Sequence, residues 1–295
     1  MRFTLAAAAP VPVVVPALVP ALVAVLVAAG PAVADAPALA HPESVVMAGE
    51  QGFVSNLGQA LDTSTRDGDG FIARIGPQGE VLDGPAIPQP GSTLDSPKGL
   101  ALLGGRLYVA DIDRIVAFDP TTGRQLAEYR PEGARSLNDL APAGERLLVT
   151  DFEAGRVLSL DPGTGRVDVI ASGIGGANGV VADGDRAYVV ATGAQLEGGG
   201  ITRIDLTSGA TAPVGDIHGR FDGVALAADG ALIVSDWVAM GTPTPGRILR
   251  VDPATGAAEP VAAPAMQGPA DLARSGDRLL VPVMLEHRVE VLPAP

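Results

Sequence analysis

One short hydrophobic segment occurs six times along the chain, and this repetition constrains the fold more than any other feature of the sequence. Each copy is a run of mainly β-branched and aliphatic residues, and a polar turn precedes it, as is typical of a strand. The copies are GFVSN (52–56), RLYVAD (106–111), RLLVTD (146–151), RAYVVA (186–191), ALIVSD (231–236) and RLLVPV (278–283). A chain that repeats one strand in this way is expected to build several copies of one structural unit.

A second predicted strand follows each copy. These strands begin the segments 71–82, 114–126, 156–167, 201–210, 247–258 and 288–292. Three of the segments contain Asp-Pro-x-Thr-Gly, in which proline fixes φ at the second turn position and glycine accepts a positive φ. The motif therefore predicts a hairpin that leads into a further strand.

A short segment ahead of each copy sets the register of the repeat. The six segments are PESVV (42–46), PKGLA (97–101), LNDLA (137–141), ANGVV (177–181), FDGVA (221–225) and ADLA (270–273). Their second residues, 40 to 55 positions apart, are Glu43, Lys98, Asn138, Asn178, Asp222 and Asp271. A period of about 40 to 50 residues with about four strands is the signature of a β-propeller blade. Residues 35–295 are therefore predicted to form one all-β domain, a six-bladed β-propeller with four-stranded antiparallel blades.

The two ends of the repeat array differ from its middle. The last repeat reaches Pro295 after its third predicted strand. We expect the N-terminal part of the domain, around residues 35–41, to supply the missing outer strand and so to close the ring. The first repeat is longer because of residues 57–70, which are expected to form a loop on one face.

The segment ahead of the repeats has the pattern of a signal peptide. Arg2 is the only charged residue before Asp35, and an apolar run rich in Ala, Val, Leu and Pro follows it. Ala32-Val33-Ala34 supplies the small-x-small pattern of a cleavage site, so residues 1–34 are expected to be removed on export. The alternative is an uncleaved membrane anchor, since the run is long enough to span a bilayer, although its prolines weaken a continuous helix. Export predicts a periplasmic or secreted protein without membrane contact after cleavage.

Composition excludes several classes of function. The chain has 34 acidic and 20 basic residues, a formal charge of −14, which is a poor match for nucleic acid. It has no cysteine, which excludes disulfides, thiolate nucleophiles and cysteine-based zinc sites. Its 38 glycines and 26 prolines favour short strands and turns over a mainly helical protein. We expect a monomer whose partner is a small-molecule substrate or ligand.

The second residues of the register segments are the most informative positions for function. In a propeller the innermost strands line the central channel, so equivalent positions form a ring around the axis. All six residues are polar, and five carry side-chain oxygens, the ligands that hard divalent cations prefer. The alternative is that they bond strand ends and channel water. A divalent cation is favoured because Glu43 and Asp222 supply negative charge. Calcium is the first candidate, and zinc, manganese and magnesium stay open.

The segments PES, LND, ANG and FDG resemble the channel-entrance motifs of the senescence marker protein/gluconolactonase family, which includes regucalcin and related lactonases. The resemblance covers the chain after its first 34 residues and rests on the order and spacing of these motifs. It implies a propeller that binds a divalent metal through Glu43, Asn178 and Asp222. It also implies that Asn138 contacts the substrate or a water molecule on the metal.

The sequence departs from the family pattern at several places. Ser136 stands where family lactonases carry an arginine that grips a sugar lactone, and Leu140 replaces the glycine of an Asn-Asp-Gly motif. Lys98 has entered the ring, and no aromatic residue follows Glu43. These changes concern the substrate more than the metal.

Two functions follow from this set of residues. A cation in the ring would act as a Lewis acid, with Asp222 or Asp271 as general base, in a metal-dependent hydrolase of a lactone or related ester. Lys98, the single lysine of the chain, would bind a substrate carboxylate, stabilise an oxyanion, or simply neutralise Glu43 and Asp271. The other function is a non-catalytic, NHL-like propeller that binds a ligand or protein and keeps a structural or vestigial metal site.

Two further motifs are expected to be mainly structural. Asp67-Gly68-Asp69-Gly70 looks like the start of a calcium loop, but the closing glutamate is absent, so it predicts a turn. Asp111, Asp151 and Asp236 end the repeated strand in three repeats, which indicates hydrogen bonding between blades or a part in shaping the pocket mouth.

Overall fold

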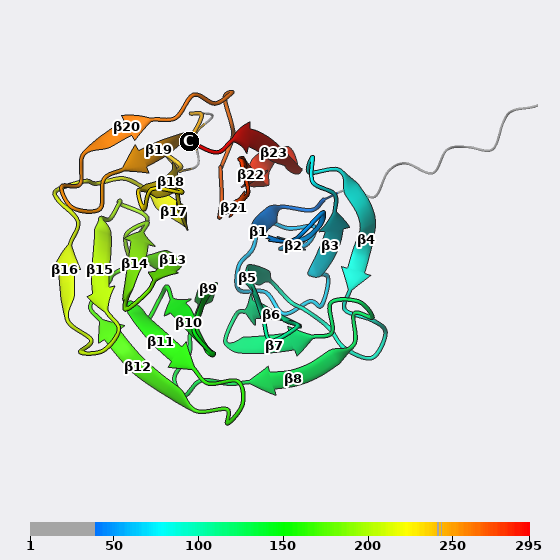
Figure 1. Cartoon of the computed structure of the whole chain (residues 1–295). Coiled ribbons are helices and arrows are strands. Elements are labelled where there is room, and N and C mark those ends of the chain that lie inside the picture. The colour runs from blue at the N-terminus through cyan, green and yellow to red at the C-terminus, as the bar shows by residue number, and fades with distance from the viewer. Residues whose placement is uncertain (1–38, 241, 243) are drawn as a thin grey trace, which may run out of the picture. The chain divides into compact units, whose positions relative to one another are not determined.

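Six antiparallel β-sheets are arranged in a ring in the computed structural model, which describes residues 39–240, 242 and 244–295 (Figure 1). The first blade contains β1 (Pro42–Ala48), β2 (Gln51–Asn56), β3 (Phe71–Ile75) and β4 (Val81–Ile87). The second contains β5 (Pro97–Leu103), β6 (Arg106–Asp111), β7 (Arg114–Phe118) and β8 (Gln125–Tyr129). The third contains β9 (Leu137–Ala143), β10 (Arg146–Asp151), β11 (Arg156–Leu160) and β12 (Val167–Ser172).

The second half of the ring repeats this plan. The fourth blade contains β13 (Ala177–Asp183), β14 (Arg186–Ala191), β15 (Ile201–Asp205) and β16 (Thr211–Pro213). The fifth contains β17 (Phe221–Leu226), β18 (Leu232–Asp236), β19 (Arg247–Val251) and β20 (Ala258–Pro260). The sixth contains β21 (Ala273–Ser275), β22 (Arg278–Val283), the 3₁₀ turn η1 (Met284–Glu286) and β23 (Arg288–Pro293).

The predicted six-bladed propeller is confirmed. Five blades have four strands in sequence order and the described part of the sixth has three, with β1, β5, β9, β13, β17 and β21 nearest the centre (Figure 1). The predicted signal peptide, residues 1–34, lies outside the described residues. Among the described residues, no helix has the length and apolar character needed to cross a membrane.

The Asp-Pro-x-Thr-Gly motifs form the turns between third and outer strands, as predicted. In the second blade, Asp119 Oδ1 accepts hydrogen bonds from the N–H groups of Thr121 and Thr122, both at 2.9 Å. Gly123 closes this turn with a φ of 69°, which glycine adopts without strain. The reversal at the outer edge is therefore encoded locally in each of these blades.

The hydrophobic core lies between neighbouring blades. In β14, Tyr188 and Val190 belong to a buried cluster shared with the fifth blade. Ala187, Val189 and Ala191 of the same strand belong to a cluster shared with the third blade. Because successive side chains of a strand point to opposite faces, each middle strand contributes to two interblade cores. The nearly continuous apolar composition of the repeated segment follows from this arrangement.

The N-terminal end of the described chain closes the ring, but it does so through an inner strand. Residues 39–41 do not form the predicted outer strand of the sixth blade; they run beside the end of β2, where Leu57 N–H donates to His41 O at 3.1 Å. Residues 35–38 of that prediction lie outside the described part of the chain. Closure comes from β1, because Asp271 N–H donates to Glu43 O at 3.0 Å. The outer edge of β23 carries charged residues, which discourage pairing with a further strand.

Candidate functional site

Each predicted ring residue of the first five blades follows the first residue of an inner strand, at a break in the strand register. In the first blade Pro42 pairs with Asn56, and the register then shifts before Val45. The same shift follows the first strand residue in the next four blades, Pro97, Leu137, Ala177 and Phe221. A β-bulge of this kind re-aims a side chain out of the regular alternation of a strand. The bulge thus explains how a polar residue beside a buried strand turns toward the channel.

The five ring residues of these blades meet at the channel mouth. Glu43, Lys98, Asn138, Asn178 and Asp222 all line one cavity of about 430 Å³. Each of them is only 2 to 8% exposed. The structure thus brings the three predicted metal ligands together with both predicted substrate-binding residues.

Asp271 lies outside this ring, so the predicted register of the sixth blade is wrong by one residue. Pro269 bridges Val283 just as Phe221 pairs with Asp236 in the fifth blade, which puts Ala270 at the sixth ring position. Asp271 does not line the cavity. The sequence could not reveal this shift, because it depends on which residues of two separate segments pair with each other.

Asp271 instead belongs with Asp139 to a second layer, one residue further along the inner strands. Asp139 Oδ2 accepts a hydrogen bond from Val180 N–H in the next blade at 2.7 Å. Asp271 Oδ2 accepts one from Ser44 Oγ, also in the next blade, at 2.6 Å. Each carboxylate also accepts the N–H of the residue after it at 2.7 Å. These two side chains therefore tie neighbouring blades together. Asp139 was not among the residues predicted from the sequence, although it stands next to Asn138.

Each of the three predicted metal ligands has one buried oxygen without a hydrogen-bond partner: Glu43 Oε2, Asn178 Oδ1 and Asp222 Oδ1. Neighbouring groups hold the other atom of two of these side chains. Asn178 Nδ2 donates to Thr192 Oγ1 at 2.8 Å, and Trp237 Nε1 donates to Asp222 Oδ2 at 2.8 Å. Buried polar atoms almost always find a partner. Two carboxylates and one amide, each with a free oxygen, fit a hard divalent cation.

The cation fit depends on the amide of Asn178. Among the described residues, no group of three or more His, Cys, Asp or Glu side chains is arranged to hold a metal ion. A site built on Glu43 and Asp222 alone would offer two carboxylates. Asn178 supplies the third oxygen, and Thr192 determines its direction.

Burial and mutual repulsion raise the pKa values of the carboxyl groups at the channel mouth. Burial, followed by the charges of Asp222 and Asp271, raises the pKa of Glu43 well above its usual range. Burial and the charge of Asp271 raise the pKa of Asp222 to about 7, and burial raises that of Asp271 to about 6. Burial also raises the pKa of Asp139 well above its usual range. A bound cation would relieve this repulsion.

Lys98 is the one cationic side chain of the ring. Burial lowers its pKa, although Glu43 attracts the ammonium group. Its Nζ donates one long hydrogen bond, 3.4 Å, to the carbonyl oxygen of Thr63. No carboxylate of the described residues forms a direct ion pair with Lys98 within 4.0 Å. The ammonium group therefore keeps donor capacity that faces the cavity.

A second set of cavity residues follows the same repeat and escaped the sequence analysis. In five blades, the residue directly after the second strand of the blade lines the cavity: Leu57, Phe152, Thr192, Trp237 and Met284. Four of these side chains are apolar, and they line the same cavity as the polar ring residues. The signal was present in the sequence, since each stands one position after a repeated strand.

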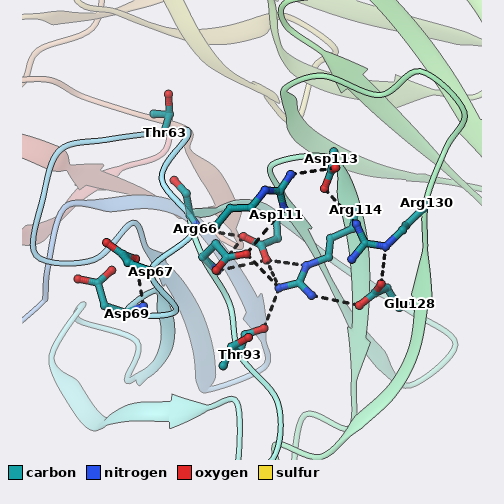
Figure 2. A network of polar contacts seen from close by, with 12 residues as sticks. Thr63, Arg66, Asp67, Asp69, Thr93, Asp111, Asp113, Arg114, Glu128 and Arg130 are labelled. Atoms are coloured by element: carbon teal, nitrogen blue, oxygen red, sulfur yellow. Dashed lines mark hydrogen bonds and ion pairs between the residues drawn. The ribbon is translucent and has the colours of Figure 1, made fainter.

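The long loop of the first blade also reaches the cavity, through Leu61 and Thr63. Figure 2 shows how a network of charged residues anchors this loop on the second blade. Arg66 Nη2 pairs with Asp113 Oδ2 at 2.9 Å. Asp67 and Asp69 do not line the cavity. Asp69 N–H donates to Asp67 Oδ1 at 3.3 Å (Figure 2), and Asp69 Oδ2 accepts the N–H of Gln59 at 2.9 Å, so the motif turns the chain as predicted.

In the second, third and fifth blades, the aspartate that ends the second strand (β6, β10 or β18) binds the segment that leads into the inner strand of the same blade. Asp111 Oδ1 accepts the N–H of Ser96 at 2.8 Å and its Oδ2 pairs with Arg114 Nη2 at 2.7 Å (Figure 2). Asp151 Oδ1 accepts the N–H of Ser136 at 3.1 Å, and Asp236 Oδ1 that of Arg220 at 3.0 Å. The predicted interblade role is therefore more specific: these acids fix the connection from the preceding blade just before the ring residue.

The chain shares its fold with propellers of known structure. It aligns with a chain of a nidogen/laminin complex with a TM-score of 0.60 and 15% identity, over 86% of this chain and 88% of that chain. It aligns with virginiamycin B lyase from Staphylococcus aureus with a TM-score of 0.58 and 14% identity, over 87% and 96%. Hydrazine synthase of Kuenenia stuttgartiensis gives a TM-score of 0.61 and 17% identity, over 88% and 78%. At these identities the similarity shows the fold alone.

A family model described as outer membrane protein assembly factor BamB matches residues 78–210. No curated protein sequence matches this chain. The comparisons agree with the propeller that the gluconolactonase resemblance implies. The activity implied by that resemblance stays a prediction.

Proposed function

We propose that the channel mouth binds one divalent cation, with calcium as the first candidate, and uses it to hydrolyse a lactone or related ester. The observation that carries this proposal is the set of three buried oxygens without partners on Glu43, Asn178 and Asp222. Leaving a buried acceptor unpaired costs about 1–3 kcal/mol, and more for a charged group. A cation shared by the three would satisfy all of them at once.

The side chains around the cation would have separate tasks. The cation supplies Lewis-acid activation of a carbonyl group and of water. Lys98 would donate a hydrogen bond to the oxygen that becomes negative when water adds to the carbonyl carbon. Asn138 would orient the substrate from the third blade, which lies between the blades of Lys98 and Asn178. The ester C–O bond then breaks, the leaving oxygen takes a proton, and a hydroxy acid is formed from a lactone.

We assign the role of proton acceptor to Asp222 rather than to Asp271. Asp222 lines the cavity; its Oδ1 would face the cation, and its Oδ2 accepts a hydrogen bond from Trp237 Nε1 only, which leaves a lone pair on Oδ2 for a proton. Both oxygens of Asp271 already accept hydrogen bonds, from Ser44 Oγ and Leu272 N–H. Asp271 would act on Asp222 through its charge, as a positioning residue for the seam between the sixth and first blades.

The decisive experiment separates cation binding from turnover. The protein is stripped with a chelator and titrated calorimetrically with calcium, magnesium, manganese and zinc. We expect one site per chain, weakened at least tenfold in Glu43→Gln and Asp222→Asn, and unchanged in Asp216→Asn, whose carboxylate is exposed. Hydrolysis of a panel of lactones is then measured through the acid that the reaction releases.

Three outcomes are informative. A cation at one per chain with hydrolysis that depends on Asp222 supports the proposal. A bound cation without hydrolysis of any lactone or ester overturns the catalytic part and favours the ligand-binding propeller. Absence of binding by all four cations overturns the metal site itself.

A further inference from the structure

The cavity at the channel mouth has a polar floor and an apolar wall. The floor consists of the ring residues. The wall contains Leu57, Phe152, Trp237 and Met284, and two leucines from loops stand at its rim, Leu61 and Leu196. Leu61 is 52% exposed and Leu196 is 41% exposed, so the rim presents apolar surface to solvent. A polyhydroxylated ligand would leave most of its hydroxyl groups facing hydrocarbon here, which is unfavourable.

The charge around the floor excludes a second class of ligand. Among the described residues, the buried acids around the floor are Glu43, Asp139, Asp222 and Asp271, and Lys98 is the single buried base near them. Carboxyl groups therefore outnumber the base four to one. An anionic ligand group would lie among these acids in a poorly solvated site, with Lys98 as its single possible charge partner, which is unfavourable. An uncharged carbonyl compound avoids this penalty and still offers an oxygen to the floor.

We propose that the channel mouth takes an uncharged lactone or ester whose carbonyl group is carried on an apolar alkyl or aryl body. The carbonyl oxygen points to the ring and to Lys98, and the body lies against Leu57, Phe152 and Trp237. This inference rests on the proposed function for the direction of the carbonyl group. The cavity of about 430 Å³ lies near the lower end of ligand pockets, so the ligand is small.

The loop of the first blade holds the rim in place for such a ligand. Leu61 and Thr63 belong to this loop, and Arg66 fixes it to the second blade through Asp113 at 2.9 Å (Figure 2). Arg66 also contacts Asp95, in the connection between β4 and β5, at 3.8 Å. Thr63 O also receives the hydrogen bond of Lys98. The same loop therefore bounds both the apolar rim and the only cation of the floor among the described residues.

The test uses Trp237, the only tryptophan of the chain, as a reporter that needs no turnover. Its fluorescence is followed while calcium-loaded protein is titrated with γ-lactones whose alkyl chain grows from methyl to octyl. A hydroxylated sugar lactone and a carboxylate-bearing γ-lactone serve as comparison ligands. We expect affinity to rise by up to about fourfold per methylene group over the first few groups. The sugar lactone and the carboxylate-bearing lactone should bind at least about tenfold more weakly than the pentyl lactone.

Matched variants locate the effect. Leu61→Ser and Leu196→Ser should flatten the dependence on chain length, whereas Leu82→Ser should leave it intact, because Leu82 is similarly exposed (53%) but lies on β4, away from the cavity. Calcium titration of each variant checks that the floor is folded.

The outcomes distinguish this inference from the proposed function. Chain-length-dependent binding without hydrolysis supports the ligand class and overturns the catalytic proposal. Tighter binding of the sugar lactone, or a chain-length dependence that survives in both rim variants, overturns the ligand class even if hydrolysis is observed.

Discussion

At the scale of single residues, a neighbouring side chain determines which atom Asn178 and Asp222 leave free in the ring. Thr192 Oγ1 donates to the carbonyl oxygen of Phe221 at 2.6 Å, so it can only accept from Asn178, and the amide must present its oxygen to the cavity. Trp237 has the same effect on Asp222 by occupying one carboxylate oxygen. Such partners commonly change metal affinity by about 10–100-fold when they are removed.

We expect Trp237→Phe to weaken calcium binding by about tenfold or more at pH 7. The indole hydrogen bond lowers the pKa of Asp222, so its loss raises that pKa above about 7 and lets protons compete better with the cation. Calorimetric titration measures the effect, since this variant lacks the fluorescent reporter. Phe152→Leu is the control, because it alters the apolar wall without a carboxylate partner. Equal affinities for wild type and Trp237→Phe would contradict the prediction.

At the scale of elements, the end of each middle strand in three blades combines a buried aspartate with an arginine at the start of the next strand. Asp111 is fully buried and accepts main-chain N–H groups from the segment that leads to Lys98. Arg114 neutralises it and also contacts Glu128 at 3.1 Å (Figure 2). The Asp111–Arg114 pair thereby fixes the position of Lys98, because Asp111 holds the main chain at Ser96, two residues before it.

We expect Asp111→Ala to lower the free energy of unfolding by about 3–5 kcal/mol, the usual effect of removing one partner of a buried ion pair. Asp83→Ala, which removes the exposed partner of Arg74, should change it by no more than about 1 kcal/mol. Chemical denaturation of both variants measures the difference. A similar loss of unfolding free energy in the two variants would show that the Asp111–Arg114 pair contributes no more to stability than an exposed ion pair.

At the scale of the whole molecule, the inner strands approach one another closely in the layer below the ring. Gly99, Gly179 and Gly223 occupy this layer in three blades, and a Cβ atom on Gly223 would lie 2.5 Å from the Cα atom of Asp271. The glycines let the blades close on the axis, and the remaining space is bridged by Ser44, Asp139 and Asp271. The assembled ring therefore gathers buried acids that no single blade contains.

This accumulation of acids predicts a stability that depends on pH and on calcium. The pKa of Asp222 is raised from 3.8 to about 7 and that of Asp271 from 3.8 to about 6. Between the lower, unfolded-state pKa and the raised pKa of each group, the folded state binds more protons than the unfolded state. In chelator, the melting temperature should therefore fall by several degrees as the pH rises from 5 to 8. Exposed acids with lowered pKa values, such as Asp119 and Asp161, are ionised in both the folded and the unfolded state over this pH range, so they do not contribute to the change in stability.

Saturating calcium should remove much of that decrease, because the cation compensates the ionised carboxylates. Differential scanning calorimetry at pH 5, 6, 7 and 8, with and without calcium, measures both effects. A melting temperature in chelator that rises across this range would contradict the assigned pKa directions. An unchanged pH dependence in calcium would count against the cation site.

The blades, their strands and five ring residues can be predicted from the amino-acid sequence, because alternation, turn residues and repeat spacing are local properties of the chain. That Ala270 rather than Asp271 completes the ring follows from the folded structure alone, because strand register depends on pairing between separate segments. The same is true of the oxygens of Asn178 and Asp222 that stay free, since Thr192 and Trp237 reach these side chains only in the folded chain. Closure of the ring by β1 could not be predicted from the sequence either. It joins the first blade to the sixth, and local sequence patterns do not relate these two ends of the repeat array to each other.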